Sequence, residues 1–506
     1  MRRWAHLLAP VFLMAAVASC APGEEGEVSF SAPAGEIPVT STSDEALHHF
    51  AEGQQAMDAG RFIEANKHFE QAVQADPAFA YGYLNAANSA TSLEEFKTNL
   101  DEAAANAETA DEGVRLLIQI GQKGLNSDVE GQLETANQLV EMYPESPRAW
   151  LTLAGIQTGL NDNEAARASM EKALEVNAEF APAYEALRSS YLFSEPIDLG
   201  KAEENARRVI ELTPEESNAH ENLGDVLRAR GRLDEARTAY AQAAELNTAD
   251  AVPVLKMGHI DSFLGNYDQA RAEYDEAIGR AREGERATFP NYRAFTWVHE
   301  GKPETAVEEL GSLVTAIDDM GLAPDEAVGA KIFTLTNEVQ IAIHHRMFDV
   351  ARTALEQRAA LMRGQTQIVG TEEFRRGQEA DIALWNGILA AETGEYEAAQ
   401  QAVATFSTLV EETRNPRAME PAHYLMGLIA LRQGDAAGAI PHLEQAVPGN
   451  MYMKYQLAVA QEMAGNAEEA RRLFGEVAEF NFNSVNFALV RKTALEKVGE
   501  TEEGTS

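Results

Sequence analysis

A segment of 34 residues is repeated back to back near the middle of the chain, from 217 to 250 and again from 251 to 284. The two copies align without a gap, and small and large apolar residues recur at the same positions of each copy. A unit this short cannot bury its own hydrophobic face, so successive copies have to stack on one another. The matched pairs are Leu223 with Met257, Gly224 with Gly258, Gly231 with Gly265, Leu233 with Tyr267, Ala236 with Ala270, Tyr240 with Tyr274 and Ala243 with Ala277.

The spacing of these residues predicts two antiparallel helices in each unit. Gly or Ala at the eighth and twentieth positions removes side-chain bulk where the helices cross, so their axes can approach to the short end of the usual range of about 8–10 Å. The Gly at the fifteenth position stands where the first helix ends, and a left-handed backbone there costs Gly little. The large apolar residues then fill the space between one helix pair and the next.

The same register continues through much of the chain. It weakens from 80 to 144, where we expect two irregular helix pairs, and again from 321 to 370. The stretch from 363 to 372 is long for a connection between two helices and predicts a loop that bends or breaks the stack. Other residues in register are Gly53, Gly60, Phe69, Trp150, Leu153, Ala154, Tyr184, Leu187, Ala294, Gly301, Gly387, Gly394, Gly427, Gly434, Leu457 and Gly465.

This pattern resembles the tetratricopeptide repeat family over the whole chain after residue 43. The resemblance implies an all-α fold: a solenoid of about a dozen antiparallel helix pairs that form a right-handed superhelix. We expect N-terminal and central repeats from 44 to 370, and C-terminal repeats with a capping helix from 371 to 498. The last residues, 499 to 506, predict a disordered tail.

The N-terminal sequence has the order of an export signal. Arg2 and Arg3 precede an apolar run from 7 to 18 that is short for a membrane span. The run ends in Val-Ala-Ser-Cys, which resembles the bacterial lipobox, in which the Cys is lipidated; the alternative is an ordinary signal peptide with an incidental Cys. We therefore predict a signal peptide over 1–19 and lipidation at Cys20, the only cysteine of the chain. Residues 20–43 are rich in Pro, Gly, Ser and Glu and predict a flexible tether.

A narrower resemblance concerns the two ends of the chain. The sequence GEIPVTSTSDEAL near residue 35 and the closing stretch from 450 to 494 are similar to the ends of a group of bacterial tetratricopeptide lipoproteins. Ala21 follows the Cys where a signal for retention in the inner membrane would place Asp. By resemblance to Gram-negative lipoproteins, we expect an exported protein of the cell envelope, at the outer membrane and facing the periplasm.

The chain is strongly acidic. It contains 81 Asp and Glu against 41 Lys and Arg, for a formal net charge of −40. Such a field repels nucleic acid, and the basic residues do not cluster, so no nucleic-acid partner is expected. The charge favours basic protein segments as partners, although a purely solubilising acidic surface that specifies no partner accounts for it better.

Two stretches and two histidine pairs resemble parts of catalytic or metal-binding motifs without completing one. The stretches that begin at His220 and His299 start like a zinc-protease helix but lack its second His. The pairs His48-His49 and His344-His345 are adjacent, and neighbours on a helix point in different directions, so they do not share a ligand face. We therefore expect no catalytic residues, no metal site, no cofactor and no enzyme activity.

The predicted binding surface is the concave face of the solenoid. In the tetratricopeptide fold, the first helix of each pair lines this face through its second, fifth, ninth, twelfth and thirteenth positions. Amide side chains there could grip a peptide backbone and aromatic side chains could supply buried area, although ordinary packing is the competing explanation. The candidates are Tyr81, Asn88, Asn218, Asp225, Arg228, His259, Asn291, Phe295, His299, Tyr452 and Tyr455.

These observations favour a lipid-anchored scaffold that binds proteins or peptides of the bacterial envelope in its groove. A preformed groove loses little entropy when it binds an extended partner. Two alternatives stay open. The protein could act as a pilotin or assembly factor for an outer-membrane or secreted complex, or as a non-catalytic activator subunit of an envelope enzyme.

Overall fold

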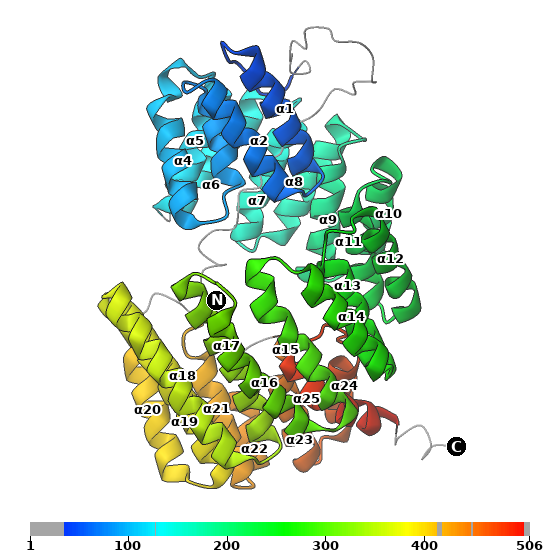
Figure 1. Cartoon of the computed structure of the whole chain (residues 1–506), viewed down its shortest axis with the longest axis vertical. Helices are drawn as coiled ribbons and strands as arrows, with labels where there is room; N and C mark the ends of the chain where they lie inside the picture. Colours follow the sequence, from blue (N-terminus) through cyan, green and yellow to red (C-terminus); the bar gives the residue numbers. More distant parts are fainter. Residues whose placement is uncertain (1–34, 127, 412–416, 447–448, 500–506) are drawn as a thin grey trace. The chain divides into compact units, whose positions relative to one another are not determined.

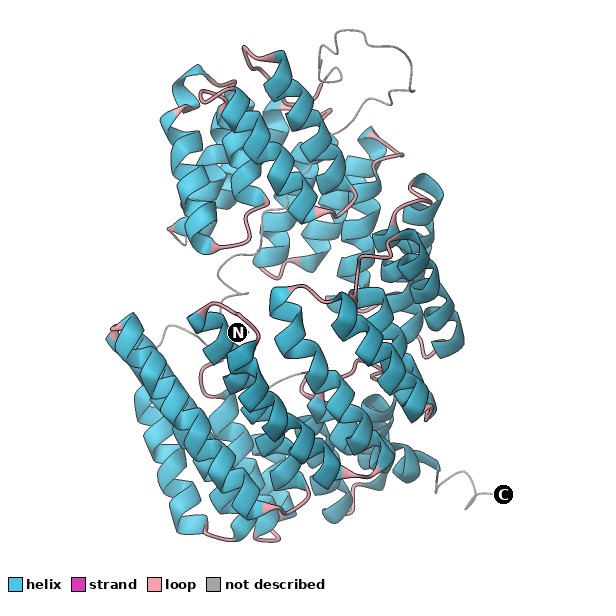
Figure 2. Ribbon diagram, viewed as in Figure 1, coloured by secondary structure: helices cyan, strands magenta, loops and turns pink. Residues whose placement is uncertain are grey.

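The fold is described from a computed structural model, in residues 35–126, 128–411, 417–446 and 449–499. Within these ranges the chain forms 25 α-helices and two short 3-10 helices, and no β-strand (Figures 1 and 2). The predicted all-α class is confirmed. The signal peptide, Cys20 and nearly all of the predicted C-terminal tail lie outside the described residues. None of the described helices is both long and apolar enough to cross a membrane.

The helices divide into two compact units, 1–226 and 227–506, which are described separately. Unit 1 contains α1 (Asp44–Asp58), α2 (Phe62–Ala75), α3 (Ala80–Asn88), α4 (Leu93–Ala105), α5 (Glu112–Leu125), α6 (Val129–Met142), α7 (Pro147–Gly159), α8 (Asn163–Val176), α9 (Ala181–Phe193) and α10 (Leu199–Leu212). The helix α11 (Ser217–Ala229) carries the division between the units. The sequence-based boundary at 370/371 stays a prediction.

Unit 2 continues the same arrangement of paired helices. In unit 1 from α1 to α10, and in unit 2 from α13 to α24, each odd-numbered helix packs on the even-numbered helix that follows it, as in α7 with α8 and α19 with α20. Its helices are α12 (Leu233–Leu246), α13 (Val252–Leu264), α14 (Tyr267–Arg280), α15 (Glu283–Glu300), α16 (Pro303–Ala316), α17 (Pro324–His344), α18 (Phe348–Val369), α19 (Glu372–Thr393), α20 (Tyr396–Val410), α21 (Glu420–Arg432), α22 (Ala436–Leu443), α23 (Met451–Met463), α24 (Ala467–Ala478) and α25 (Val485–Gly499).

The recurring small residues act as the sequence predicts. A Cβ atom on Gly53 would lie 2.7 Å from the Phe69 ring, and one on Gly258 would lie 2.9 Å from the Tyr274 ring. Each Gly thus lets the second helix of its pair place an aromatic ring directly against the first helix. At the turn between α13 and α14, Gly265 has φ of 81°, the left-handed conformation expected at the end of the first helix.

The predicted loop from 363 to 372 is wrong. Two long helices, α18 and α19, run through this stretch and leave only Gly370 and Thr371 between them. Gly370 ends α18 with φ of 70°, and the Thr371 side chain caps α19 by accepting a hydrogen bond from the backbone N–H of Phe374. Gln and Arg are good helix formers, so the polar stretch extends the helix instead of interrupting it.

The predicted tether is wrong for its last nine residues, 35–43, which pack against unit 1. Ile37 is buried, and Ser146 at the start of α7 donates a hydrogen bond of 2.5 Å to Glu36. Further along, Ser41 donates a hydrogen bond of 2.5 Å to Asp76 at the end of α2. An extended segment of the chain therefore lies against several helix pairs of its own solenoid.

The C-terminal helix does more than cap the stack. It spans residues 485–499 and packs on α23 and α24 as a cap would. It also packs on α15 and α17, which come much earlier in the chain. Phe487 is fully buried, with its ring centroid 5.4 Å from that of Phe263 on α13. The end of the chain thus lies on first helices of unit 2, the helices predicted to form an open groove.

Candidate protein-binding surfaces

Four predicted groove residues belong to unit 1, and most of them are engaged within it. Tyr81 is buried against the ring of Phe50, with centroids 5.1 Å apart, and burial raises the pKa of its hydroxyl well above the usual value. Asn218 donates a hydrogen bond of 3.0 Å to the carbonyl of Ala59 in the turn after α1. Asn88 and Asp225 are half-buried, and the amide nitrogen Nδ2 of Asn88 has no hydrogen-bond partner among the described residues.

In unit 2, two predicted residues contact the segment that precedes α25, and a third contacts one of these two. The Arg228 guanidinium lies 4.4 Å from the centroid of the Phe482 ring and 3.4 Å from His259 Nδ1. His299 Nε2 lies 3.3 Å from Asn483 Oδ1, and burial lowers the pKa of His299 to about 4. All three predicted side chains are buried. The structure thus brings Arg228, His259 and His299 together, but around a segment of the same chain.

The remaining predicted residues also pack inside unit 2. Asn291 is fully buried and accepts a hydrogen bond of 3.0 Å from Asn337, while Phe295 is buried in the core. Tyr452 is half-buried with its hydroxyl 3.0 Å from His344 Nδ1, and the Tyr455 ring meets the Phe474 ring edge-on. The expectation that these side chains line an open groove therefore needs correction for the buried ones, because their burial leaves them out of reach of a partner. They are Tyr81, Arg228, His259, Asn291, Phe295 and His299.

A buried ion pair in unit 1 escaped the sequence analysis. Arg148 on α7 is 2% exposed and donates two hydrogen bonds to Asp58 at the end of α1, of 3.0 and 2.7 Å. Its guanidinium also lies 5.0 Å from the centroid of the Phe180 ring. Burial raises the pKa of Asp58, and Arg148 opposes that shift by stabilising the carboxylate. The pair joins helices far apart in sequence, so no local pattern announces it.

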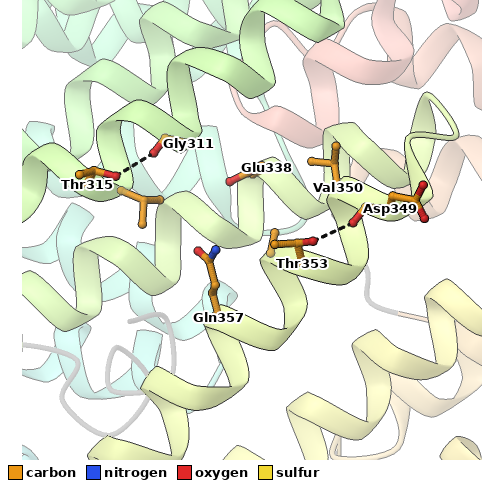
Figure 3. A pocket seen from close by; sticks show the side chains of 9 residues that line it. Gly311, Thr315, Glu338, Asp349, Val350, Thr353 and Gln357 are labelled. Carbon is orange, nitrogen blue, oxygen red and sulfur yellow. Dashed lines mark hydrogen bonds between the residues drawn. The ribbon is translucent and has the colours of Figure 1, made fainter.

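A cavity of about 390 Å³ opens between α16, α17 and α18 (Figure 3). Figure 3 shows the side chains of Glu338 and Gln357 approaching it from α17 and α18. The Thr315 and Thr353 hydroxyls at its wall donate to backbone carbonyls of their own helices. This leaves the half-buried Glu338 carboxylate, the Gln357 amide and the exposed Asp349 carboxylate as the polar side-chain groups at the cavity. The remaining lining residues are Gly311, Val314, Asp349, Val350 and Ala354.

The Glu338 carboxylate is half-buried and joins no other described residue through a hydrogen bond or ion pair. Desolvation by burial raises its pKa to about 7. A Cβ atom on Gly311 would lie 3.9 Å from Glu338 Oε1, so the missing side chain at 311 leaves space beside the carboxylate. The cavity therefore combines room for a side chain with an acidic group that lacks a cation.

Stacked helix pairs with a Gly turn and a small-residue crossing define the class of the protein, an α-helical repeat solenoid. Three family models match: a tetratricopeptide repeat-like domain over 99–264, and tetratricopeptide repeats over 254–283 and 430–492. The chain therefore contains tetratricopeptide repeats over 99–283 and 430–492.

Comparison with individual proteins gives more distant similarities. Anaphase-promoting complex subunit 3 of Schizosaccharomyces pombe is 26% identical over 214 residues, which are 42% of this chain and 31% of that protein. The chain thus spans about a third of that relative. Among solved structures, yeast Tom70 is 13% identical, with 90% of this chain and 96% of that chain covered and a TM-score of 0.34. YrrB, a tetratricopeptide protein, is 22% identical, with coverages of 39% and 98% and a TM-score of 0.29.

Proposed function

We propose that the protein is a non-catalytic scaffold that binds a basic segment of a partner protein, with a Lys or Arg side chain entering the Glu338 cavity. The repeat architecture supports protein binding, because tetratricopeptide repeats form interaction scaffolds. The observation that carries the proposal is the Glu338 carboxylate itself, half-buried in a side-chain-sized cavity without a cation beside it. The lipobox-like sequence at Cys20 adds an anchor in a bacterial envelope membrane, the outer membrane facing the periplasm.

The energetics favour a cationic ligand. A carboxylate that is partly removed from water is costly to ionise, and this cost appears as its raised pKa. An ammonium or guanidinium group in the cavity would restore the lost interaction through charge-assisted hydrogen bonds, each worth about 1.5–3 kcal/mol. The net charge of −40 would also attract a basic segment over a distance and speed its association.

Site-specific photo-crosslinking in the cells that express the protein tests this proposal. A photoreactive amino acid replaces Gln357 at the cavity wall, and in a matched chain it replaces the exposed Glu356 on the same helix. We expect a discrete cross-linked partner from position 357 that is lost when Glu338→Gln is added. The cross-linked peptide of that partner should contain Lys or Arg. Identical products from 356 and 357, or products unaffected by Glu338→Gln, would refute the proposal.

A further inference from the structure

A cluster of metal-binding side chains lies on the first helix pair, away from the surfaces described above. His49 and Glu52 lie one turn apart on α1, and His68 lies on α2. The ligand atoms of these three residues, one from each, all lie within 4.8 Å of one another. The hairpin thus brings together two imidazoles and a carboxylate that the sequence keeps 19 residues apart, from 49 to 68.

The distances fit a common metal ion. His49 Nδ1 lies 3.3 Å and His68 Nδ1 lies 3.1 Å from the same carboxylate oxygen, Glu52 Oε2. Two ligands bound to a tetrahedral Zn²⁺ at about 2.0–2.1 Å are separated from each other by about 3.3 Å. The two observed separations match this edge length, and a small rotation of the side chains would let one ion replace the direct contacts.

His68 offers a second reason to place an ion here. Its Nδ1 atom is buried and makes no hydrogen bond of acceptable geometry, although it lies 3.1 Å from the Glu52 carboxylate. Buried polar atoms are normally satisfied, so an unsatisfied one calls for an explanation such as an ion. His48, on the exposed side, lies 3.4 Å from the other oxygen, Glu52 Oε1, and could orient the carboxylate from outside the ligand set.

The position of these residues in the repeat argues against ordinary packing. Counted from residue 46, where the first unit starts, His49 and Glu52 occupy the fourth and seventh positions. In the unit that starts at 147, Trp150 and Leu153 occupy these positions. The first unit of a solenoid needs a polar outer face for solubility. Lys or Glu side chains would supply that polarity, so solubility alone does not account for two histidines here. A set of two histidines and one carboxylate has the composition of sites that bind Zn²⁺ or a similar transition-metal ion.

We propose that His49, Glu52 and His68 bind one Zn²⁺-class ion, which joins α1 to α2 and stabilises the first repeat. This site is independent of the Glu338 cavity and of the partner-binding function. The adjacent residues His48 and His49 need not share a ligand face for this site to form. Its ligands come from α1 and α2 together.

Metal titration of the full chain tests the site. The protein is freed of metal with a chelator and titrated with Zn²⁺ by calorimetry, and with Co²⁺ followed by its visible absorption. We expect one ion per chain and, for His49→Gln or His68→Ala, binding weakened at least about 100-fold, the upper end of what loss of an outer-shell partner costs. Hydrogen exchange of α1 and α2 should slow when Zn²⁺ is added to the wild type but not to the variants.

His423→Ala is the matched control, because His423 Nδ1 lies 3.2 Å from His442 Nδ1 and forms another histidine pair, in unit 2. Removing it should leave the ion bound at α1 and α2. The metal-free variants are compared by circular dichroism, and His49→Gln serves if His68→Ala does not fold. The proposal fails if wild-type protein takes up no Zn²⁺, or if uptake survives both ligand substitutions.

Discussion

Replacing Glu338 by Gln should make unit 2 more stable at alkaline pH. The carboxyl group has a pKa of about 7 in the folded protein, against 4.5 for its ordinary value. The unfolded chain therefore releases this proton at lower pH than the folded chain does, and wild-type stability falls as pH rises from 4.5 to 7. Gln keeps the shape of the protonated acid and cannot ionise, so the variant escapes this loss.

The magnitude follows from the shift. The rise of the Glu338 pKa from 4.5 to about 7 corresponds to about 3.4 kcal/mol of unfolding free energy. Solvent screening of this half-buried group reduces the expected effect to about 2 kcal/mol. The difference in unfolding free energy between variant and wild type should thus grow by about 2 kcal/mol between about pH 4 and about pH 8.

Urea denaturation followed by circular dichroism measures this difference at each pH, and hydrogen exchange of peptides from α17 locates it. Glu356→Gln is the control, because Glu356 is exposed on α18 and does not line the cavity. A variant-to-wild-type difference that is the same at both pH values would show that the Glu338 carboxylate is fully solvated. That result would also remove the physical basis for a cation-binding cavity.

Three further changes test other parts of the structure. Asp58→Asn leaves the buried Arg148 guanidinium without its carboxylate and should destabilise unit 1 by about 3–5 kcal/mol in urea denaturation; Asp58→Leu with Arg148→Met should recover most of that loss. Phe487→Ala should lower the free energy of unfolding of unit 2 by about 3–5 kcal/mol and speed hydrogen exchange in α15 and α25 but not in α1 to α10. Unchanged exchange in α15 would contradict the packing of α25 on α15. Cys20→Ser should move the protein from the membrane fraction to the soluble fraction on cell fractionation, and continued membrane attachment would count against the lipid anchor.

The sequence predicts the helix pairs well because their signals are local. A Gly with positive φ follows the first helix of several pairs, as at 231, 265 and 301, and the helices on either side follow from apolar residues spaced along one face. Even the irregular stretch from 80 to 144 forms the two expected pairs, α3 with α4 and α5 with α6. The prediction fails at 363–372, where Gln and Arg are good helix formers and the single Gly364 is accommodated inside α18.

The candidate site was less predictable, because it depends on contacts between residues far apart in the chain. The repeat pattern assigns Arg228, His259 and His299 to one face of their helices, and the structure does bring them together. It cannot show that the segment 481–499 packs onto that face, since the contact between His299 and Asn483 joins residues 184 positions apart. The isolation of Glu338 is equally invisible, because nearby cations on α17 and α18 bind other carboxylates: Lys331 pairs with Asp318, Arg358 with Asp381 and Arg363 with Glu379.

The sequence by itself thus determined the class of fold, the helix pairing and the turn residues, all of which arise from interactions within one unit of about 34 residues. The tertiary structure alone decided which polar groups are paired, buried or open to a ligand. Asp58 lies beside Arg148, and His49, Glu52 and His68 lie close together. In unit 2, α25 packs on α15 and α17. The physical reason is that burial and charge pairing depend on the neighbours a side chain acquires after the units stack.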